Sequence, residues 1–306
     1  MKVKKRYILV TIVFLAGIFF AINYTPDIPL DKLKSTYTND NSQFIQVENI
    51  EVHYRREGEG PSLLLLHGTA SSLHTWDSYT EQLSDSFEIV RLDLPGFGLT
   101  GPFMGTDYSI EHYVNFLDLF VDQIGLDSFI IIGNSLGGHI AMEYSLSYPQ
   151  KVNKQVLIDP AGAPYDNPSP FIFTLAKIPV INLIIKWITP KSLIKDNLEQ
   201  VYFDDNKVSE GLIDRYYELT LRTGNRQAFI DRAKTPSHFF NKEDLNCNLE
   251  TLVIWGKEDT WIRPEESEFF LGLPNSNLIL VNECGHVPME ECPEGTFEGL
   301  LEFLNQ

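Results

Sequence analysis

The sequence predicts an α/β fold: an eight-stranded, mostly parallel sheet with an inserted helical cap. From Phe44 onward, short apolar runs alternate with stretches of helical periodicity, a pattern typical of parallel sheets with right-handed crossovers. Between Ile158 and Thr251, some 90 residues show helical periodicity but no clear strand, which is too long for a simple connection. We interpret residues 163–248 as the cap and residues 44–162 and 249–306 as the two parts of the core.

Eight segments have the patterns expected of strands. Residues 44–47 and 50–54 alternate like a half-buried hairpin around Glu48 and Asn49. Six denser apolar runs indicate parallel strands covered on both faces: 62–66, 87–92, 129–133, 154–158, 251–255 and 277–281. A helix with Ser109 as its N-cap is predicted from apolar residues at helical spacing between Tyr113 and Ile124.

Composition and charge exclude several classes of protein. The chain of 306 residues is 43% apolar and 22% charged, as in ordinary globular proteins. Its 24 Lys and Arg against 42 Asp and Glu give a formal charge of -18, so no basic face is expected to neutralise phosphates. Nucleic acid is therefore excluded as a partner. Three cysteines are too few for a disulfide framework.

The amino terminus has the composition of a membrane segment. Four basic residues between Lys2 and Arg6 precede an uncharged run at 7–22, which would span roughly 24 Å as a helix. We expect residues 1–24 to be an uncleaved anchor in the membrane, with the catalytic domain outside the cytoplasm. A cleaved signal peptide, and thus a secreted enzyme, is the alternative. Residues 25–43, polar with two prolines, are predicted to be a tether.

A nucleophile elbow is predicted at Ser135. Gly133-Asn134-Ser135-Leu136-Gly137 matches G-x-S-x-G after an apolar strand and before a helix. The tight turn would hold the serine in a strained conformation, and side chains two positions away on either side would collide. The backbone N–H groups of Leu136 and Thr69, with Ala70 in reserve, are the expected oxyanion donors.

A base and an acid are expected at later strand ends. Asp259 follows the strand at 251–255, and His286 follows the strand at 277–281. The order Ser135, Asp259, His286 is the one that α/β-hydrolases use. His286 would act as the base and Asp259 would orient it. Asp159, which ends another strand, is the alternative acid.

From Phe44 to Phe303, the chain resembles α/β-hydrolase fold proteins of the cap-bearing, epoxide-hydrolase-like branch. The landmarks are His67-Gly68 with Trp76, Asp93-Leu94-Pro95-Gly96-Phe97-Gly98, the Ser135 elbow, Trp255-Gly256 with Asp259, and Gly285-His286 with Pro288. Epoxide hydrolases and haloalkane dehalogenases of this architecture carry an aspartate where this chain has Ser135. The resemblance therefore implies serine hydrolase chemistry through an acyl-enzyme.

No cofactor or metal is expected. Cys284, His286 and Cys292 match no zinc spacing, and the two cysteines are either a disulfide or buried thiols. The apolar stretch at 171–188 would line an acyl pocket, rest on a bilayer interface or pack in the cap.

The predicted function is cleavage of an ester of an apolar or lipid-like acid. The same triad also supports carbon–carbon bond hydrolysis, perhydrolysis and acyl transfer. A noncatalytic binding protein on this fold is the alternative from a different class.

Overall fold

The sheet has eight strands in the order β1-β2-β4-β3-β5-β6-β7-β8. The computed structural model describes all residues except 1–6, 8–10, 12–13, 16, 19 and 165–169. The strands are β1 (Ser42–Val47), β2 (Ile50–Glu57), β3 (Ser62–Leu66), β4 (Glu88–Leu92), β5 (Phe129–Asn134), β6 (Val152–Ile158), β7 (Glu250–Gly256) and β8 (Ser276–Val281). Strand β2 is antiparallel to both of its neighbours, and all other pairs are parallel. The predicted fold class is confirmed.

The hairpin β1–β2 turns at the predicted residues. Val47 pairs with Ile50, so Glu48 and Asn49 form a two-residue loop. Both have positive φ angles, 48° and 67°, as a type I′ turn requires to match the twist of the strands.

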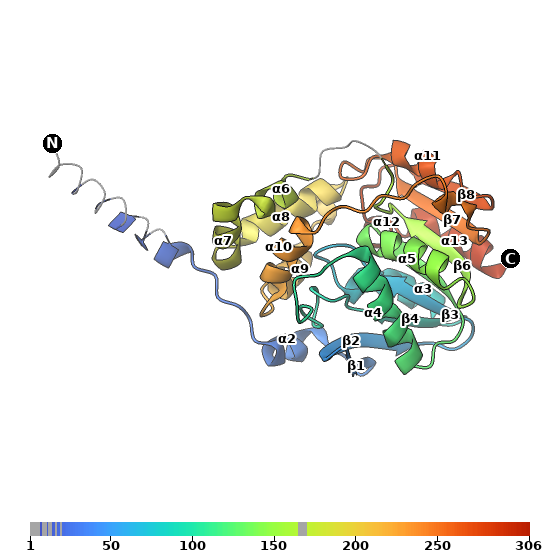
Figure 1. Cartoon of the computed structure of the whole chain (residues 1–306), viewed down its shortest axis with the longest axis horizontal. Helices are drawn as coiled ribbons and strands as arrows, with labels where there is room; N and C mark the ends of the chain where they lie inside the picture. The colour runs from blue at the N-terminus through green and yellow to red at the C-terminus, as the bar shows by residue number, and fades with distance from the viewer. Residues whose placement is uncertain (1–6, 8–10, 12–13, 16, 19, 165–169) are drawn as a thin grey trace.

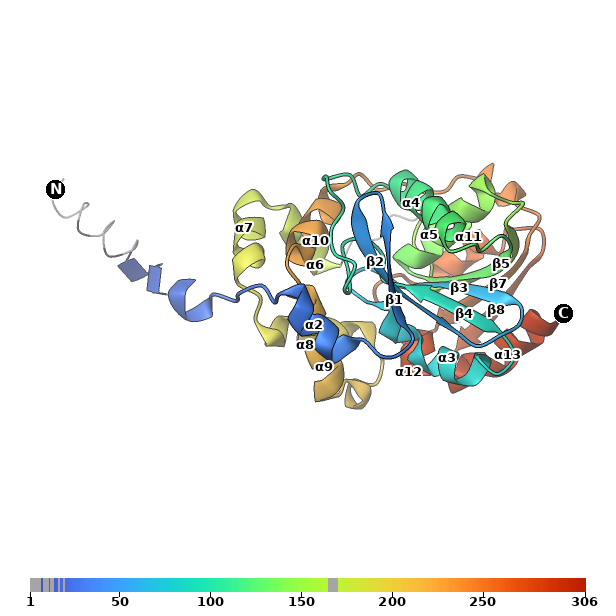
Figure 2. The ribbon, with the colours of Figure 1, turned by 90° about the horizontal axis from the view of Figure 1, so that it is seen from below.

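Helices cover both faces of the sheet (Figure 2). One face packs α4 (Ile110–Gln123), α5 (Leu136–Ser147) and α11 (Ser267–Phe270); the other packs α3 (Asp77–Leu83), α12 (Pro288–Glu291) and α13 (Glu294–Asn305). Leu64 and Leu66 of β3 belong to the first apolar cluster, while Leu63 and Leu65 belong to the second. The run of leucines from Leu63 to Leu66 is therefore explained by the burial of both faces of β3. As predicted, Ser109 caps α4, accepting a hydrogen bond from the His112 amide.

In the described part of the interval between β6 and β7, five α-helices lie beside the core (Figure 1). They are α6 (Phe171–Lys177), α7 (Pro179–Trp187), α8 (Lys191–Val201), α9 (Glu210–Thr220) and α10 (Asn225–Lys234). The described residues of this interval include no named strand, in agreement with an inserted helical segment. We call α6–α10 the cap; its limits at 163–248 stay a prediction.

The predicted membrane anchor requires correction. The basic cluster and part of the apolar run, at 1–6, 8–10, 12–13, 16 and 19, lie outside the described residues. Among the residues that are described, no helix has the length and apolar character needed to cross a membrane. The prediction of a membrane-anchored enzyme with its catalytic domain outside the cytoplasm is therefore wrong. Even fully helical, the run would be shorter than a hydrocarbon core of about 30 Å.

Segment 25–43 differs from the predicted tether. It contains α2 (Leu30–Tyr37), whose Leu33 is only 1% exposed and packs in a small cluster with Leu99 and Leu219. The Thr25 amide donates to the carbonyl oxygen of Trp187 at 2.8 Å. These contacts fasten the segment to both the cap and the core.

Candidate active site

Ser135 sits in a strained turn between β5 and α5. Its φ and ψ angles are 55° and -115°, in the left-handed range that costs a non-glycine residue about 1–3 kcal/mol. A Cβ on Gly133 would lie 2.2 Å from the Gly137 carbonyl oxygen, and one on Gly137 would lie 2.1 Å from the Leu66 carbonyl oxygen. Only glycine fits at these two positions, as the sequence motif predicts.

Two backbone amides beside Ser135 are free to bind an oxyanion. Within the described part of the chain, neither Leu136 N nor Thr69 N donates a hydrogen bond to a protein acceptor. Leu136 is the first residue of α5, where the helix leaves its amides without intrahelical partners. Ala70 follows Thr69 with a positive φ of 61°. The pair has the chemistry of an oxyanion hole, and its role remains a prediction.

His286 and Asp259 come together at the carboxyl ends of β8 and β7. The Nδ1 atom of His286 lies 2.7 Å from Oδ2 of Asp259, and both residues are buried. The other carboxylate oxygen accepts the amides of Trp261 and Ile262, at 2.7 and 3.0 Å. The carboxylate holds the imidazole proton on Nδ1, which leaves Nε2 as an acceptor.

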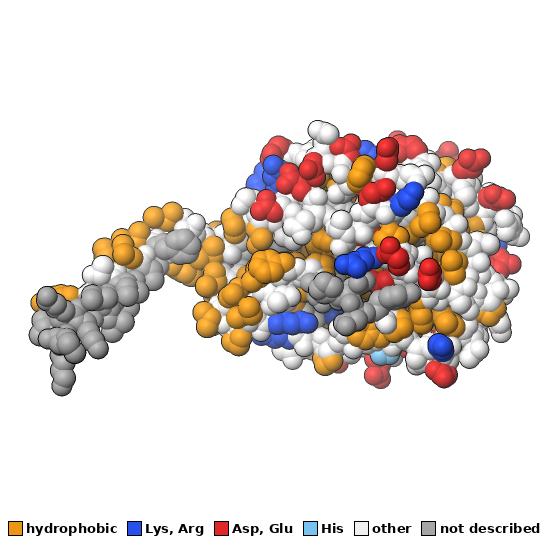
Figure 3. Space-filling model, turned by 90° about the horizontal axis from the view of Figure 1, so that it is seen from above, with side chains coloured by type: hydrophobic (Ala, Val, Ile, Leu, Met, Phe, Trp, Pro, Cys, Tyr) orange, Lys and Arg blue, Asp and Glu red, His pale blue; other side chains and the backbone are white. Residues whose placement is uncertain are grey.

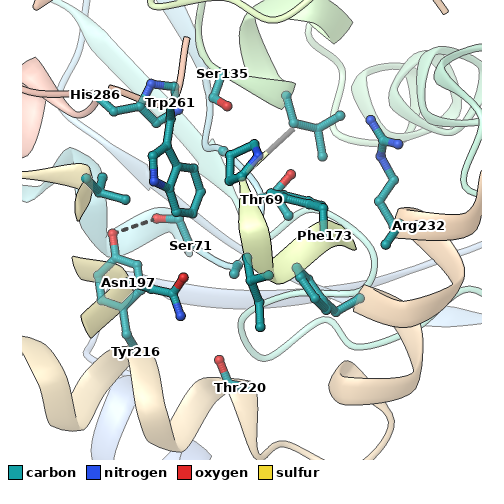
Figure 4. A pocket seen from close by; sticks show the side chains of 18 of the residues that line it. Thr69, Ser71, Ser135, Phe173, Asn197, Tyr216, Thr220, Arg232, Trp261 and His286 are labelled. Atoms are coloured by element: carbon teal, nitrogen blue, oxygen red, sulfur yellow. Dashed lines mark hydrogen bonds between the residues drawn. The ribbon is translucent and has the colours of Figure 1, made fainter. Parts of the chain in front are cut away.

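The Ser135 hydroxyl lines the same cavity as His286 but makes no hydrogen bond to any described residue. Catalytic hydrogen bonds are often long in the absence of substrate. Figure 4 shows the two side chains near each other at one end of the cavity.

Two further contacts position His286, and sequence reasoning missed both. Asn134 donates through Nδ2 to the His286 carbonyl oxygen at 3.0 Å. The His286 amide donates to the carbonyl oxygen of Val201, at the end of α8 in the cap, at 2.7 Å. The only indication in the sequence that Asn134 contributes to the site was its position directly before Ser135.

Asp159, the alternative acid, lies near the pair without bonding to His286. Its Oδ1 accepts the Gly256 amide at 3.0 Å, whereas Oδ2 is buried without a described partner. Ligand atoms of Asp159, Asp259 and His286 all lie within 4.8 Å of one another. Burial, and then the neighbouring Asp259, raise the pKa of Asp159 well above its usual range. This rise favours the neutral, protonated form of Asp159.

A cavity of about 290 Å³ opens onto Ser135 and His286. The core contributes Gly68, Thr69, Ser71 and Trp261, and the cap contributes side chains of α6 to α10. Most cap positions are apolar, among them Phe173, Ile185, Leu193, Ile194, Leu198 and Phe229. The cavity is thus a mostly apolar chamber with the reactive groups at one end (Figure 4).

The apolar stretch at 171–188 divides between the cavity and the surface. Ile172, Phe173 and Ile185 line the cavity. Other apolar side chains point to solvent, and Figure 3 shows apolar side chains gathered on this end of the molecule. The exposed set comprises Phe171, Ile178, Val180, Leu183, Ile184 and Trp187.

A hydrogen-bond network joins the cap to the loop that carries Thr69. Tyr216 of α9 donates to Glu290 of α12 at 2.7 Å and lies 3.2 Å from the hydroxyl of Ser71. Glu290 also accepts from Thr75 at 2.9 Å and pairs with Arg215. Sequence reasoning missed this network.

Among the residues that the structure describes, two groups of side chains offer closely spaced metal-ligand atoms. In the group Cys284, Glu291 and Cys292, the two sulfurs are joined as a disulfide, which removes the thiolates that a metal would need. In the group Asp159, Asp259 and His286, the Nδ1 atom is already bonded to Asp259. Neither set fits a structural zinc site. Cys284 and Cys292 were expected to be either a disulfide or buried thiols, and in the structure they form a disulfide. Cys247 is free and buried.

The comparisons agree with the fold. Over 280 residues, the chain is 27% identical to 2-hydroxy-6-oxononadienedioate/2-hydroxy-6-oxononatrienedioate hydrolase 1 of Pseudomonas putida, covering 87% of this chain and 97% of the relative. It is 28% identical over 264 residues to a monoacylglycerol lipase of Bos taurus, covering 81% and 77%. A meta-cleavage product hydrolase from Pseudomonas fluorescens superposes with a TM-score of 0.74 at 23% identity, covering 86% and 97%, which shows the shared fold.

A serine elbow on a parallel sheet, with an Asp–His pair at the neighbouring strand ends, defines a hydrolase of the α/β fold. Residues 63–298 match the model of the alpha/beta hydrolase family. The chain therefore belongs to the alpha/beta hydrolase family.

Proposed function

We propose that this chain is a serine hydrolase that cleaves an ester of an apolar or lipid-like acid through an acyl-enzyme. Ser135 is the nucleophile, His286 the base and Asp259 the group that orients it. One observation carries the proposal. The hydrogen-bonded pair of His286 and Asp259, the hydroxyl of Ser135 and two free amides all lie at one end of an apolar cavity.

The first half-reaction forms the acyl-enzyme. The Ser135 oxygen attacks the ester carbonyl carbon while Nε2 of His286 takes the hydroxyl proton. The negative charge on the carbonyl oxygen is stabilised by the N–H groups of Thr69 and Leu136, at the N-terminus of α5. His286 then gives its proton to the leaving alcohol as the carbon–oxygen bond breaks.

The second half-reaction reverses these roles with water. His286 removes a proton from a water molecule, the resulting hydroxide attacks the acyl carbon, and the proton returns to Ser135 as the free acid leaves. Asp259 stabilises the imidazolium in both halves. The apolar walls supplied by α6, α8 and α10 hold the acyl chain and exclude further water.

A fluorophosphonate probe tests the nucleophile. The purified full-length protein should be labelled, and mass spectrometry of the digest should place the label on Ser135. Ser135→Ala is the direct control, and Ser145→Ala, at a buried serine of α5 bonded to its own helix, should leave labelling unchanged. Absence of labelling in the folded protein would favour a noncatalytic binding protein.

Hydrolysis of a carbon–carbon bond is the second candidate, because the Pseudomonas putida relative is named for a 2-hydroxy-6-oxo acid substrate. The rates of ester cleavage and of carbon–carbon bond cleavage distinguish the two candidate functions. A dienol-type 2-hydroxy-6-oxo acid consumed at least 100-fold faster than any ester, judged by kcat/KM, would replace the ester proposal. Added methanol or hydrogen peroxide in the ester assay reveals acyl transfer or perhydrolysis as methyl ester or peracid.

A further inference from the structure

The charged residues that line the substrate cavity are all cationic. Lys177, Arg226 and Arg232 line it, and its described lining includes no Asp or Glu. This bias runs against the composition of the protein, whose formal net charge is -18. The three side chains differ in the groups that compensate their positive charge.

The charges of two of these cations are balanced by the protein or solvated by water. Arg226 donates to Oδ1 of Asp27 at 2.6 Å and to the carbonyl oxygen of Thr25 at 2.9 Å, so its charge is compensated. Lys177 ends α6 as an exposed residue, where water solvates its ammonium group. Neither requires a ligand.

Arg232 has no such compensation. Its guanidinium makes no hydrogen bond or ion pair with any described residue, and its Nε is buried without an acceptor. Burial lowers the pKa of Arg232, and the pKa of nearby His139 falls to about 3 through burial and then through the Arg232 charge. Arg232 is half-buried in the wall of the cavity. A cation that is largely withdrawn from water and has no counter-charge among the described residues favours the binding of an anion.

The position of Arg232 suits the far end of a bound substrate. The residue lies in the last turn of α10 and lines the cavity. Figure 4 shows it beside Phe173, on the opposite side of the view from His286 and Trp261. An apolar stretch of ligand can therefore run from the reactive end to the guanidinium.

We propose that Arg232 is an anion-binding subsite and that the substrate carries a free carboxylate separated from its scissile bond by an apolar segment. This substrate class rests on the proposed function, since it assumes that the reaction occurs at Ser135. Guanidinium binds carboxylate through two parallel hydrogen bonds. One unpaired guanidinium balances the single charge of a carboxylate.

Two pairs of esters test the subsite. p-Nitrophenyl hexanoate and the mono-p-nitrophenyl ester of adipic acid differ by a carboxylate on the acyl chain. Methyl and carboxymethyl hexanoate differ by a carboxylate on the alcohol. In at least one pair, we expect the wild type to prefer the charged ester by kcat/KM, and Arg232→Met to reduce the preference about 10- to 100-fold.

Control variants separate the subsite from a general charge effect. Arg232→Lys keeps the cation and should retain part of the preference. Lys234→Met removes an exposed charge from the same helix, at a position that does not line the cavity, and should leave the preference unchanged. The effect of Arg232→Met is measured as the ratio of kcat/KM between the charged and the neutral ester of each pair, so a general loss of activity cancels.

Failure of the subsite is distinguishable from failure of the proposed function. Equal rates within both pairs, or a preference that survives Arg232→Met, would overturn the subsite while leaving the hydrolase intact. If no ester is cleaved, the subsite can still be tested by binding. Calorimetry would then compare the affinities of the Ser135→Ala variant for monomethyl adipate and dimethyl adipate. Tighter binding of the acid, lost in Ser135→Ala with Arg232→Met, supports the subsite; equal binding contradicts it.

Discussion

The imidazole of His286 and the carboxylate of Asp259 meet through a 2.7 Å contact between Nδ1 and Oδ2. The second oxygen of Asp259 is held by two backbone amides, so the carboxylate cannot turn away from the ring. This arrangement fixes which imidazole nitrogen carries the proton and directs the other toward the cavity that Ser135 lines.

Removing Ser135 or His286 should abolish most of the ester hydrolysis. Because the two groups act as a unit, Ser135→Ala, His286→Ala and the double variant should each lose roughly 10⁴-fold or more in kcat, with losses that do not add. Initial rates on p-nitrophenyl hexanoate, with circular dichroism to verify folding, provide the measurement. Additive losses in the double variant would show that the residues act independently.

Asp259 and Asp159 should differ in their sensitivity to the same substitution. Asp259→Asn removes the charge that stabilises the imidazolium and should reduce kcat roughly 10³- to 10⁴-fold. Burial and Asp259 raise the pKa of Asp159, which favours its neutral form, so Asp159→Asn should stay within about tenfold of the wild type. Full activity in Asp259→Asn together with an inactive Asp159→Asn would make Asp159 the acid.

The sequence predicted the strands and the elbow well because both depend on local constraints. Each central strand is buried on both faces, so its apolar run marks its limits to within two residues, as for 62–66 and Ser62–Leu66. The elbow is equally local, since Gly133 and Gly137 have no room for a Cβ. Asp259 and His286 could be proposed because each follows a recognisable strand.

Other features depend on contacts between distant residues, for which the sequence has no local pattern. The bond between Tyr216 and Glu290 joins residues 74 apart. That Arg232 has no partner among the described residues is likewise visible only in three dimensions. Helix α2 was missed because only Leu33 of its eight residues is buried. The prediction of a membrane anchor was wrong because the apolar composition of residues 7–22 does not by itself establish a helix long enough to cross a membrane.

The cavity should favour medium-chain acyl groups. Each CH₂ buried against the cap contributes up to about 0.8 kcal/mol, or about fourfold in kcat/KM, when chains lengthen from acetate. A series of p-nitrophenyl esters from acetate to octanoate measures this preference. Ile185→Asn places an amide in the cavity and should weaken the chain-length dependence, whereas Ile184→Asn, at an exposed neighbour, should not. A flat wild-type profile would indicate that the cap serves only for packing.

The protein should lose stability between pH 6.5 and 4. Burial lowers the pKa of His74 to about 4 and that of His139 to about 3. In this range the unfolded chain binds protons that the folded chain does not, so the free energy of unfolding falls as the pH falls. At pH 5 the loss is about 2 kcal/mol per histidine relative to neutral pH.

Urea unfolding at pH 7 and pH 5 measures this loss. His139→Leu should be less sensitive to pH than the wild type, because it removes one of the two groups. Equal stability of the wild type at both pH values would contradict the assignment of buried neutral histidines.

The hydroxyl of Tyr216 should position the oxyanion loop from the cap. It donates to Glu290 and contacts the hydroxyl of Ser71, two residues after Thr69. Tyr216→Phe removes both contacts while keeping the ring, and should reduce kcat roughly tenfold with little change in KM, since oxyanion contacts strengthen only in the transition state. The matched control is Tyr217→Phe, on the same helix and away from the cavity, which should be silent. A rise in KM at constant kcat would instead assign Tyr216 to substrate binding alone.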